Sequence, residues 1–238
     1  MRIVKEYEER KAELLDTALR LFISKGYEQT SINDILNEVG ISKGTFYYYF
    51  KSKEQLLEVM AARHADRRLA VWNEWMQDRS IDAVEKLNRV LKSAGCLEVL
   101  ESGAAVAQLK EAYGRNNHLF RREMHKALIE IAGPELAKIV EQGRKEGAFN
   151  TRYPRESIGL IIALGESALE QLAGYTADCA AERHCRPEAM RTYLVCQDAM
   201  ERILGAKSGS VQFLLPELFD SLIGELDAAA DEASINPR

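Results

Sequence analysis

Features that would point to a secreted, membrane-bound or strand-rich protein are missing from this sequence. Its 238 residues hold only four cysteines and five prolines. The cysteines, at positions 96, 179, 185 and 196, show no paired spacing, and residues 1–6 become charged at once, unlike a secretory signal. No alternation of polar and apolar residues leads into a hairpin turn. We therefore expect an all-α protein of the cytoplasm with reduced thiols.

Catalytic, metal-binding and membrane-spanning patterns are absent as well. There is no G-x-S-x-G, H-E-x-x-H, P-loop or dinucleotide-binding fingerprint, so we expect neither an enzyme nor a cofactor. The longest apolar stretch, residues 158–172, contains two glutamates and does not predict a membrane span. Cys179, His184 and Cys185 lie close together in a predicted loop, but no second pair of ligands accompanies them. We therefore expect no metal site.

Length and composition predict a globular protein of one or two domains. Hydrophobic residues make up 46% and charged residues 29% of the chain, whose net charge is −5. The charge is unevenly distributed: residues 1–68 hold 12 Lys+Arg and 11 Asp+Glu, a net of +1, and the rest carries −6. This acidic balance argues against a protein that coats nucleic acid without regard to sequence.

Residues 42–53 differ from this background, because they contain three lysines, five consecutive aromatic residues and no carboxylate. Such a segment is poorly suited to an ordinary core and well suited to a polyanion. The residues in front of it form the stripe of a short amphipathic helix, with apolar side chains at Ile32, Ile35, Leu36 and Val39. The segment therefore follows directly on a predicted helix and points to nucleic acid.

Capping residues predict where these short helices begin and end. Thr30 or Ser31 can cap the first helix, Gly40 supplies the turn residue, and Ser42 can cap the second helix. Ser52 opens an S-x-x-Q capping box for a further helix. Two short helices joined by a glycine-containing turn are the signature of a helix-turn-helix, whose second helix enters the major groove of DNA.

One helical turn cannot bury all five aromatic side chains, so they must point in different directions. Phe46 and Phe50 are four residues apart and are expected to share the inward face. Tyr47, Tyr48 and Tyr49 project elsewhere, either to donate to phosphate or to pack against neighbouring helices with wet hydroxyls. Both alternatives stay open on these residues alone.

Residues 10–60 resemble the DNA-binding domain of the TetR family of bacterial transcriptional repressors. The resemblance rests on Ala18-x-x-Leu21-Phe22, Gly26-Tyr27, Thr30, Ile35, Val39-Gly40-Ile41-Ser42, Gly44-Thr45-Phe46-Tyr47, Phe50 and Ser52-Lys53-Glu54-x-Leu56. It implies an all-α fold, with a three-helix DNA-binding domain at 1–60 (helix-turn-helix about 31–50) and a C-terminal regulatory and dimerisation domain at 61–238. The function it implies is a ligand-responsive repressor that binds a pseudo-palindromic operator as a homodimer. A regulator of the same fold without a small-molecule effector is the alternative.

The resemblance also implies which residues contact DNA. These are Ser31 and Asn33 of the second helix, Lys43, Gly44, Thr45, Tyr47, Tyr48 and Tyr49 of the third, and Lys53 of the fourth. The fourth helix is expected to run from Lys53 to about Gln77. We expect it to act as a lever between the two domains.

Two further predicted helices, about 155–178 and 187–204, carry broad apolar faces. These consist of Leu160, Ile161, Leu164, Gly165, Ala168 and Leu172 in one helix and Met190, Tyr193, Leu194, Met200 and Ile203 in the other. Such faces can form the chain's own core. The resemblance implies instead that they pair with their copies in a four-helix dimer interface.

The effector would be small and largely apolar, because residues 80–150 are mostly apolar. The candidate contacts are Trp72, Trp75, Tyr113, His118, Phe120 and His125. A helix is expected to open at Ser80, a turn at 116–117, an interruption or kink at 133–134 and a terminal amphipathic segment at 211–226.

Overall fold

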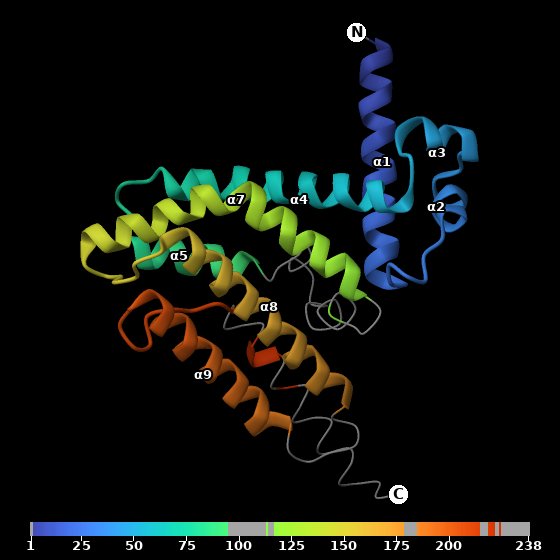
Figure 1. Cartoon of the computed structure of the whole chain (residues 1–238). Helices are drawn as coiled ribbons and strands as arrows, with labels where there is room; N and C mark the ends of the chain where they lie inside the picture. Colours follow the sequence, from blue (N-terminus) through green and yellow to red (C-terminus); the bar gives the residue numbers. More distant parts are fainter. Residues whose placement is uncertain are drawn as a thin grey trace, which may run out of the picture.

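The computed structural model describes residues 2–94, 113, 117–178, 185–214, 219–221 and 224. In this part of the chain it contains helices and no strand, which confirms the predicted all-α fold (Figure 1). The helices are α1 (Arg2–Ser24), α2 (Ile32–Val39), α3 (Lys43–Tyr49), α4 (Lys53–Met76), α5 (Ala83–Ala94), α7 (His118–Glu146), α8 (Pro154–Asp178) and α9 (Cys185–Leu204).

The first three helices and the start of α4 enclose one hydrophobic core, and we call this part the head. Its fully buried side chains include Leu14, Phe22, Ile35, Phe46, Phe50 and Leu56. The head lies at one end of the molecule, with α2 and α3 furthest from the C-terminal helices (Figure 1). The short helices α2 and α3 have too few residues to be stable alone, so this shared core must hold them in place.

A second core is formed by α5, α7, α8, α9 and the later turns of α4. Its fully buried side chains include Trp72, Leu87, Leu136, Ile158 and Ile161. Helix α4 packs along α7, α7 packs on α8, and α8 lies beside α9 (Figure 1). The 24 residues of α4 span about 36 Å at 1.5 Å per residue. One continuous helix therefore joins the two cores, as the sequence predicted.

Two of the expected helix boundaries need correction. Helix α7 runs unbroken through Pro134, so this proline does not interrupt it. Buried side chains on both sides, Leu128 and Leu136 among them, hold the helix together across the hydrogen bond that proline cannot donate. Helix α5 begins at Ala83 instead of Ser80, because the Asp82 carboxylate accepts the Glu85 N–H at 2.8 Å.

Residues 205–214, after α9, cross back over the C-terminal core without forming a helix, and residues 219–221 and 224 are helical again. The side chain of Asn88 in α5 donates to the Ser210 carbonyl at 2.9 Å and accepts from the Gln212 N–H at 2.8 Å. The buried carboxylate of Glu201 in α9 accepts from the Val211 N–H at 3.0 Å. The amphipathic segment expected from Val211 thus starts as an irregular strap, held by side chains that replace helical hydrogen bonds.

Candidate nucleic-acid interface

Side-chain caps build the turn between α2 and α3. Ser31 Oγ accepts from the Asp34 N–H at 3.1 Å, and the Asp34 carboxylate accepts from the Ser31 N–H at 2.7 Å. Gly40 ends α2 with a φ of 72°, a conformation that strains other residues. Ser42 Oγ then accepts from the Thr45 N–H at 3.1 Å and starts α3. The predicted caps and turn are confirmed, with Ser31 as the first cap.

The start of α4 follows the predicted capping box in one half only. Ser52 Oγ accepts from the Gln55 N–H at 3.2 Å, as expected. The Gln55 side chain, however, accepts from the Lys51 N–H at 2.6 Å instead of the Ser52 N–H. Side chains thus bind the backbone N–H groups of both Lys51 and Gln55 where α4 begins. These two bonds fix the direction in which α4 leaves α3.

Helix α3 turns one aromatic face inward and one outward. Phe46 and Phe50 are 0% and 1% exposed, whereas Tyr47 and Tyr48 are 47% and 72% exposed. The Lys43 ammonium lies 6.0 Å from the centre of the Tyr47 ring. The predicted inward face is confirmed. The outward face presents a lysine and two phenols, groups that donate hydrogen bonds to phosphates or base edges.

The nine residues predicted to contact DNA occupy α2, α3 and the first turn of α4. Six of them are exposed, namely Ser31, Asn33, Lys43, Gly44, Tyr47 and Tyr48, while Thr45, Tyr49 and Lys53 are partly buried. All nine belong to the end of the molecule that carries α2 and α3 (Figure 1). DNA contact by each residue remains a prediction, which these exposures support for six of them.

A tyrosine of α1 packs against the outward face, and the sequence reading missed it. The Tyr7 ring lies 4.8 Å from the Tyr49 ring and 5.7 Å, edge to face, from the Tyr48 ring. Both alternatives for the tyrosines are thus realised in part, since Tyr49 is half buried by packing while Tyr48 stays mostly exposed. Aromatic pairs of this geometry contribute about 0.5–1.5 kcal/mol beyond burial. Tyr7 therefore helps to order the tyrosines of α3.

Lys53 has a structural role that its position in the sequence did not reveal. Its ammonium donates to the carbonyls of Tyr27 and Thr30 at 2.9 and 3.1 Å. It also lies 4.1 Å from the centre of the Tyr27 ring. Two of its three N–H groups are thus directed into the α1–α2 loop, which leaves one donor for a phosphate.

These two environments predict different effects for two lysine substitutions. Lys43→Ala removes only an exposed charge, so we expect weaker DNA binding, a salt-dependence slope smaller by about one, and unchanged thermal stability. Lys53→Ala also removes the ammonium hydrogen bonds to the Tyr27 and Thr30 carbonyls, so we expect a lower melting temperature in addition. Salt titrations and thermal melts of both variants measure the difference. A Lys53→Ala protein that melts like wild type would show that the loop contacts carry no stability.

The helices predicted to form a dimer interface lie side by side, but only part of each predicted face is free. Leu160, Leu194 and Met190 are exposed at 57%, 51% and 37%, and Leu164, Tyr193 and Ile203 are partly buried. Val195, which the sequence reading omitted, is 62% exposed. Between α8 and α9 lies a groove of about 270 Å³, lined by Leu164, Ser167, Ala168, Gln171, Arg191, Thr192, Val195, Cys196 and Ala199.

Other members of the predicted interface belong to the chain's own core, which corrects their assignment. Ile161, Leu172 and Met200 are 0% exposed. They are covered by neighbouring helices and have no surface to offer a partner. Ala168 is 1% exposed and borders the groove only at its floor. Gly165 lies 3.5 Å, measured from the position of a Cβ, from the Met200 methyl group of the same chain. A charge at Gly165 would therefore disturb the core before any interface.

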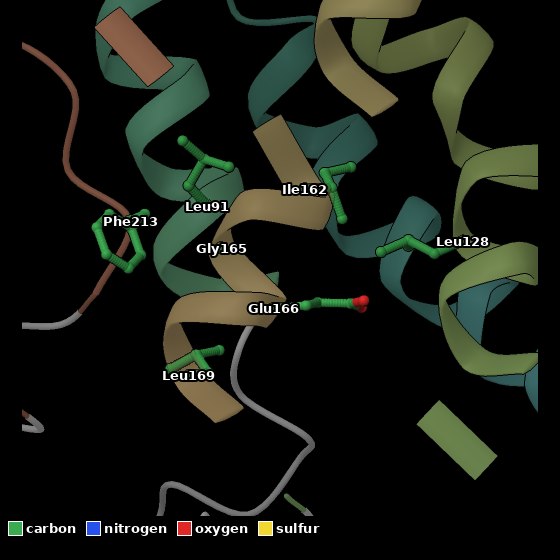
Figure 2. A pocket seen from close by; sticks show the side chains of 7 residues that line it. All are labelled: Leu91, Leu128, Ile162, Gly165, Glu166, Leu169 and Phe213. Atoms are coloured by element: carbon green, nitrogen blue, oxygen red, sulfur yellow. The ribbon is translucent and has the colours of Figure 1, made fainter. Parts of the chain in front are cut away.

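A small cavity lies inside the C-terminal core (Figure 2). It measures about 20 Å³ and is lined by Leu91, Leu128, Ile162, Gly165, Glu166, Leu169 and Phe213. This volume holds about one water molecule. Among the described residues of the lining, Glu166 is the only ionisable one, and its carboxylate lies 2.7 Å from His125 Nδ1. The two groups form an ion pair that is poorly aligned for a hydrogen bond, and Glu166 raises the pKa of His125.

None of the six residues predicted as effector contacts lines this cavity. Phe120 is 1% exposed and belongs to the core of the head, where its ring lies 6.4 Å from that of Phe22, so its prediction was wrong. Trp72 is 1% exposed and donates from its indole to Ser93 Oγ at 2.8 Å. Trp75 and Tyr113 pack at the edge of the C-terminal core, and His118 is exposed. Only His125 approaches the cavity, through Glu166.

Among the described residues, no three His, Cys, Asp or Glu side chains lie close enough to hold a metal ion. Cys179 and His184 of the candidate cluster lie outside the described residues, as does the side chain of Cys185. No helix in the described part of the chain is long and apolar enough to cross a membrane.

The fold and the outward face of α3 together define a helix-turn-helix DNA-binding protein. Residues 14–60 match the family described as "Bacterial regulatory proteins, tetR family", and residues 102–179 match "Tetracyclin repressor-like, C-terminal domain". The chain belongs to the TetR family of bacterial transcriptional regulators.

Relatives agree with this membership, and solved structures share the fold. The uncharacterised HTH-type regulator YfiR of Bacillus subtilis is 24% identical over 196 residues, 81% of this chain and 94% of that protein. YerO of the same organism is 53% identical over 49 residues, which are only 17% of its length. Reduced NemR of E. coli has a TM-score of 0.55 at 18% identity and covers 84% of this chain and 99% of its own. RolR in complex with resorcinol has a TM-score of 0.53 at 18% identity and covers 92% and 95%.

Proposed function

We propose that this TetR-family regulator is a ligand-responsive repressor that binds a pseudo-palindromic operator as a homodimer in the cytoplasm. The observation that carries the proposal is the outward face of α3, where Lys43, Tyr47 and Tyr48 project from a helix capped at both ends. A rigid short helix with exposed donors at its N-terminal turns suits base edges in the major groove. We propose no catalytic activity, because the residues of this face are assigned to DNA contact.

The domain division that we propose places DNA recognition in residues 1–60 and regulation and dimerisation in 61–238. The exposed leucines and valine of α8 and α9 support dimerisation, because monomers rarely expose several large apolar side chains along one pair of helices. The groove between these helices offers small side chains at Ala168 and Ala199, where a partner helix can approach closely. Like most soluble oligomers, a dimer through this face would have twofold symmetry, which matches a pseudo-palindromic operator.

Selection from a random pool of DNA duplexes tests the proposed operator directly. A homodimer should enrich a sequence with two inverted half-sites about one helical turn apart. Lys43→Ala should lower the enrichment, whereas a substitution on the far side of the molecule, such as Tyr153→Ala, should not. Enrichment of a single, asymmetric half-site by the wild-type protein would contradict the homodimer, and no enrichment at all would contradict sequence-specific binding.

We propose an effector that is mostly apolar and has one hydrogen-bond donor. Its binding would enlarge the small cavity. The donor would face Glu166, since the other described residues of the lining are apolar or glycine. RolR, which shares the fold, binds resorcinol, an aromatic compound with two hydroxyl groups. A ligand that entered here would have to displace Phe213 or spread α7 from α8, and this movement would provide the difference in affinity between the two states.

Binding of such a ligand should weaken operator binding. We expect small phenols that raise the melting temperature of the protein to reduce its affinity for the selected duplex by about 1–3 kcal/mol, and the duplex to reduce phenol affinity equally. Titrations that follow the fluorescence of Trp72 and Trp75 measure both directions. A phenol that binds inside the C-terminal core and leaves operator affinity unchanged would contradict the coupling.

The cavity volume of about 20 Å³ favours one alternative, a regulator of this fold without a small-molecule effector. Such a protein would answer to a protein partner or to DNA sites alone. It would bind the selected duplex with the same affinity in the presence of every small molecule tested. The fluorescence titrations described above therefore separate the two functions.

A further inference from the structure

The loop between α1 and α2 is held by a residue from the opposite domain. The backbone N–H of Tyr27 donates to Asn117 Oδ1 at 2.9 Å, across 90 positions of sequence. The Asn117 amide also donates weakly to the Ile23 carbonyl, at 3.5 Å. Asn117 is 2% exposed. A buried backbone N–H without a partner is costly, so this contact decides whether the loop can adopt its conformation.

Asn117 makes this contact at the expense of its own helix. It occupies the N-cap of α7, where asparagine ordinarily accepts a hydrogen bond from the first turn, yet its side chain makes no capping hydrogen bond. Replacing a capping side chain by one that does not cap costs about 1 kcal/mol. An N-cap asparagine without the usual capping hydrogen bond is typical of positions that serve a function elsewhere in the fold.

One turn further along α7, an aromatic side chain completes the core of the head. Phe120 is 1% exposed and packs among head residues, with Leu119 and Met124 at the edge of the same cluster. The first turns of α7 are therefore a physical part of the head, although α7 begins 65 residues after the start of α4 in the sequence. A polar bond and an apolar anchor fix α7 to the head together.

The same loop residue, Tyr27, is also bound by α4. While Asn117 binds the N–H of Tyr27, Lys53 binds its carbonyl and that of Thr30. Ser31, the N-cap of α2, follows directly. The position of α2, and through the turn at Gly40 that of α3, thus depends on both α4 and α7.

We propose that Asn117 and Phe120 form a latch through which α7 sets the position of the recognition helix, in addition to α4. Asn117 is then a positioning residue for operator binding, because it is 2% exposed and acts through the loop. The other consequence concerns regulation: α7 also carries Leu128 of the cavity and His125 beside Glu166. Leu128 lies eight residues from Phe120, or about 12 Å along the helix. Any shift of α7 at the cavity reaches the loop through this rigid helix.

Substitution of Asn117 tests the latch, and the test rests on the proposed DNA binding in one arm only. Asn117→Ala leaves the Tyr27 N–H without an acceptor, whereas Asn117→Asp keeps an acceptor in place. Asn150→Ala, at an exposed asparagine of the C-terminal domain, is the matched control. We expect Asn117→Ala to bind the selected duplex about five- to tenfold more weakly, with an unchanged salt-dependence slope because no phosphate contact is removed. Asn117→Asp and Asn150→Ala should stay close to wild type.

Hydrogen exchange provides a readout that is independent of DNA. In Asn117→Ala, amide exchange should accelerate at Tyr27 and throughout α2 and α3, while α5 and α8 keep wild-type rates. Wild-type exchange in residues 25–50 would overturn the latch, as would an equal loss of DNA affinity in Asn117→Asp. Acceleration spread evenly over both domains would also overturn it, because it would indicate general destabilisation. A wild-type protein that selects no duplex would refute the proposed function and leave the exchange test of the latch standing.

Discussion

Leu194→Glu is expected to turn the dimer into a monomer. Leu194 is 51% exposed on α9, next to Val195 at 62%. In the proposed twofold interface the two glutamates would be buried without partners. A buried charge without a compensating partner costs about 3–5 kcal/mol. This corresponds to an increase of at least a hundredfold in the dissociation constant of the dimer.

Sedimentation at micromolar concentration measures this change. Val71→Glu is the matched control, because Val71 is 52% exposed and lies on α4. The control should remain dimeric, and both variants should keep the wild-type melting profile of the monomer fold. A Leu194→Glu protein that stays dimeric would contradict the proposed interface, and a monomeric wild type would contradict dimerisation itself.

Phe46→Ala is expected to unfold the head and abolish DNA binding. Phe46 is 0% exposed and lies at the centre of α3, with the rings of Tyr47 and Phe50 at 5.4 and 5.9 Å. Truncating a buried phenylalanine costs about 3–5 kcal/mol, a large part of the total stability of a small domain. Helix α3 would lose Phe46, the side chain that it buries in the core of the head.

Tyr48→Ala separates this loss of stability from loss of DNA contact. Tyr48 is 72% exposed, so its removal should change the free energy of unfolding by about 0.5 kcal/mol or less and still weaken DNA binding. Urea denaturation followed by circular dichroism measures the stability of both variants. An unchanged denaturation midpoint in Phe46→Ala would contradict the role of Phe46 as the anchor of α3.

The helix-turn-helix could be predicted in detail because its geometry is encoded locally. Each cap joins residues only three apart, such as Ser31 with Asp34 and Ser42 with Thr45. The inward face of α3 follows from the helical repeat alone. Helix α4 could be predicted for the same reason, since a cap opens it and no glycine or proline interrupts it before Met76.

Contacts between distant segments could not be predicted in this way. Nothing near Asn117 in the sequence indicates that it binds the loop at Tyr27, and Phe120 looked like a cavity residue for the same reason. Periodicity also shows which side of a helix is apolar without showing what covers it. The faces of α8 and α9 were therefore assigned to a partner as a whole, although Ile161 and Met200 are buried by their own chain.

The central claim is that α3 reads DNA from the major groove, and methylation protection tests it most directly. Dimethyl sulfate modifies guanine N7 in the major groove and adenine N3 in the minor groove, positions that the two grooves expose separately. On the selected duplex, we expect protection of guanine N7 in two successive major grooves, about 34 Å apart. This protection should be lost with Lys43→Ala. Protection confined to adenine N3, or guanine N7 protection that survives Lys43→Ala and Tyr47→Ala together, would contradict the account.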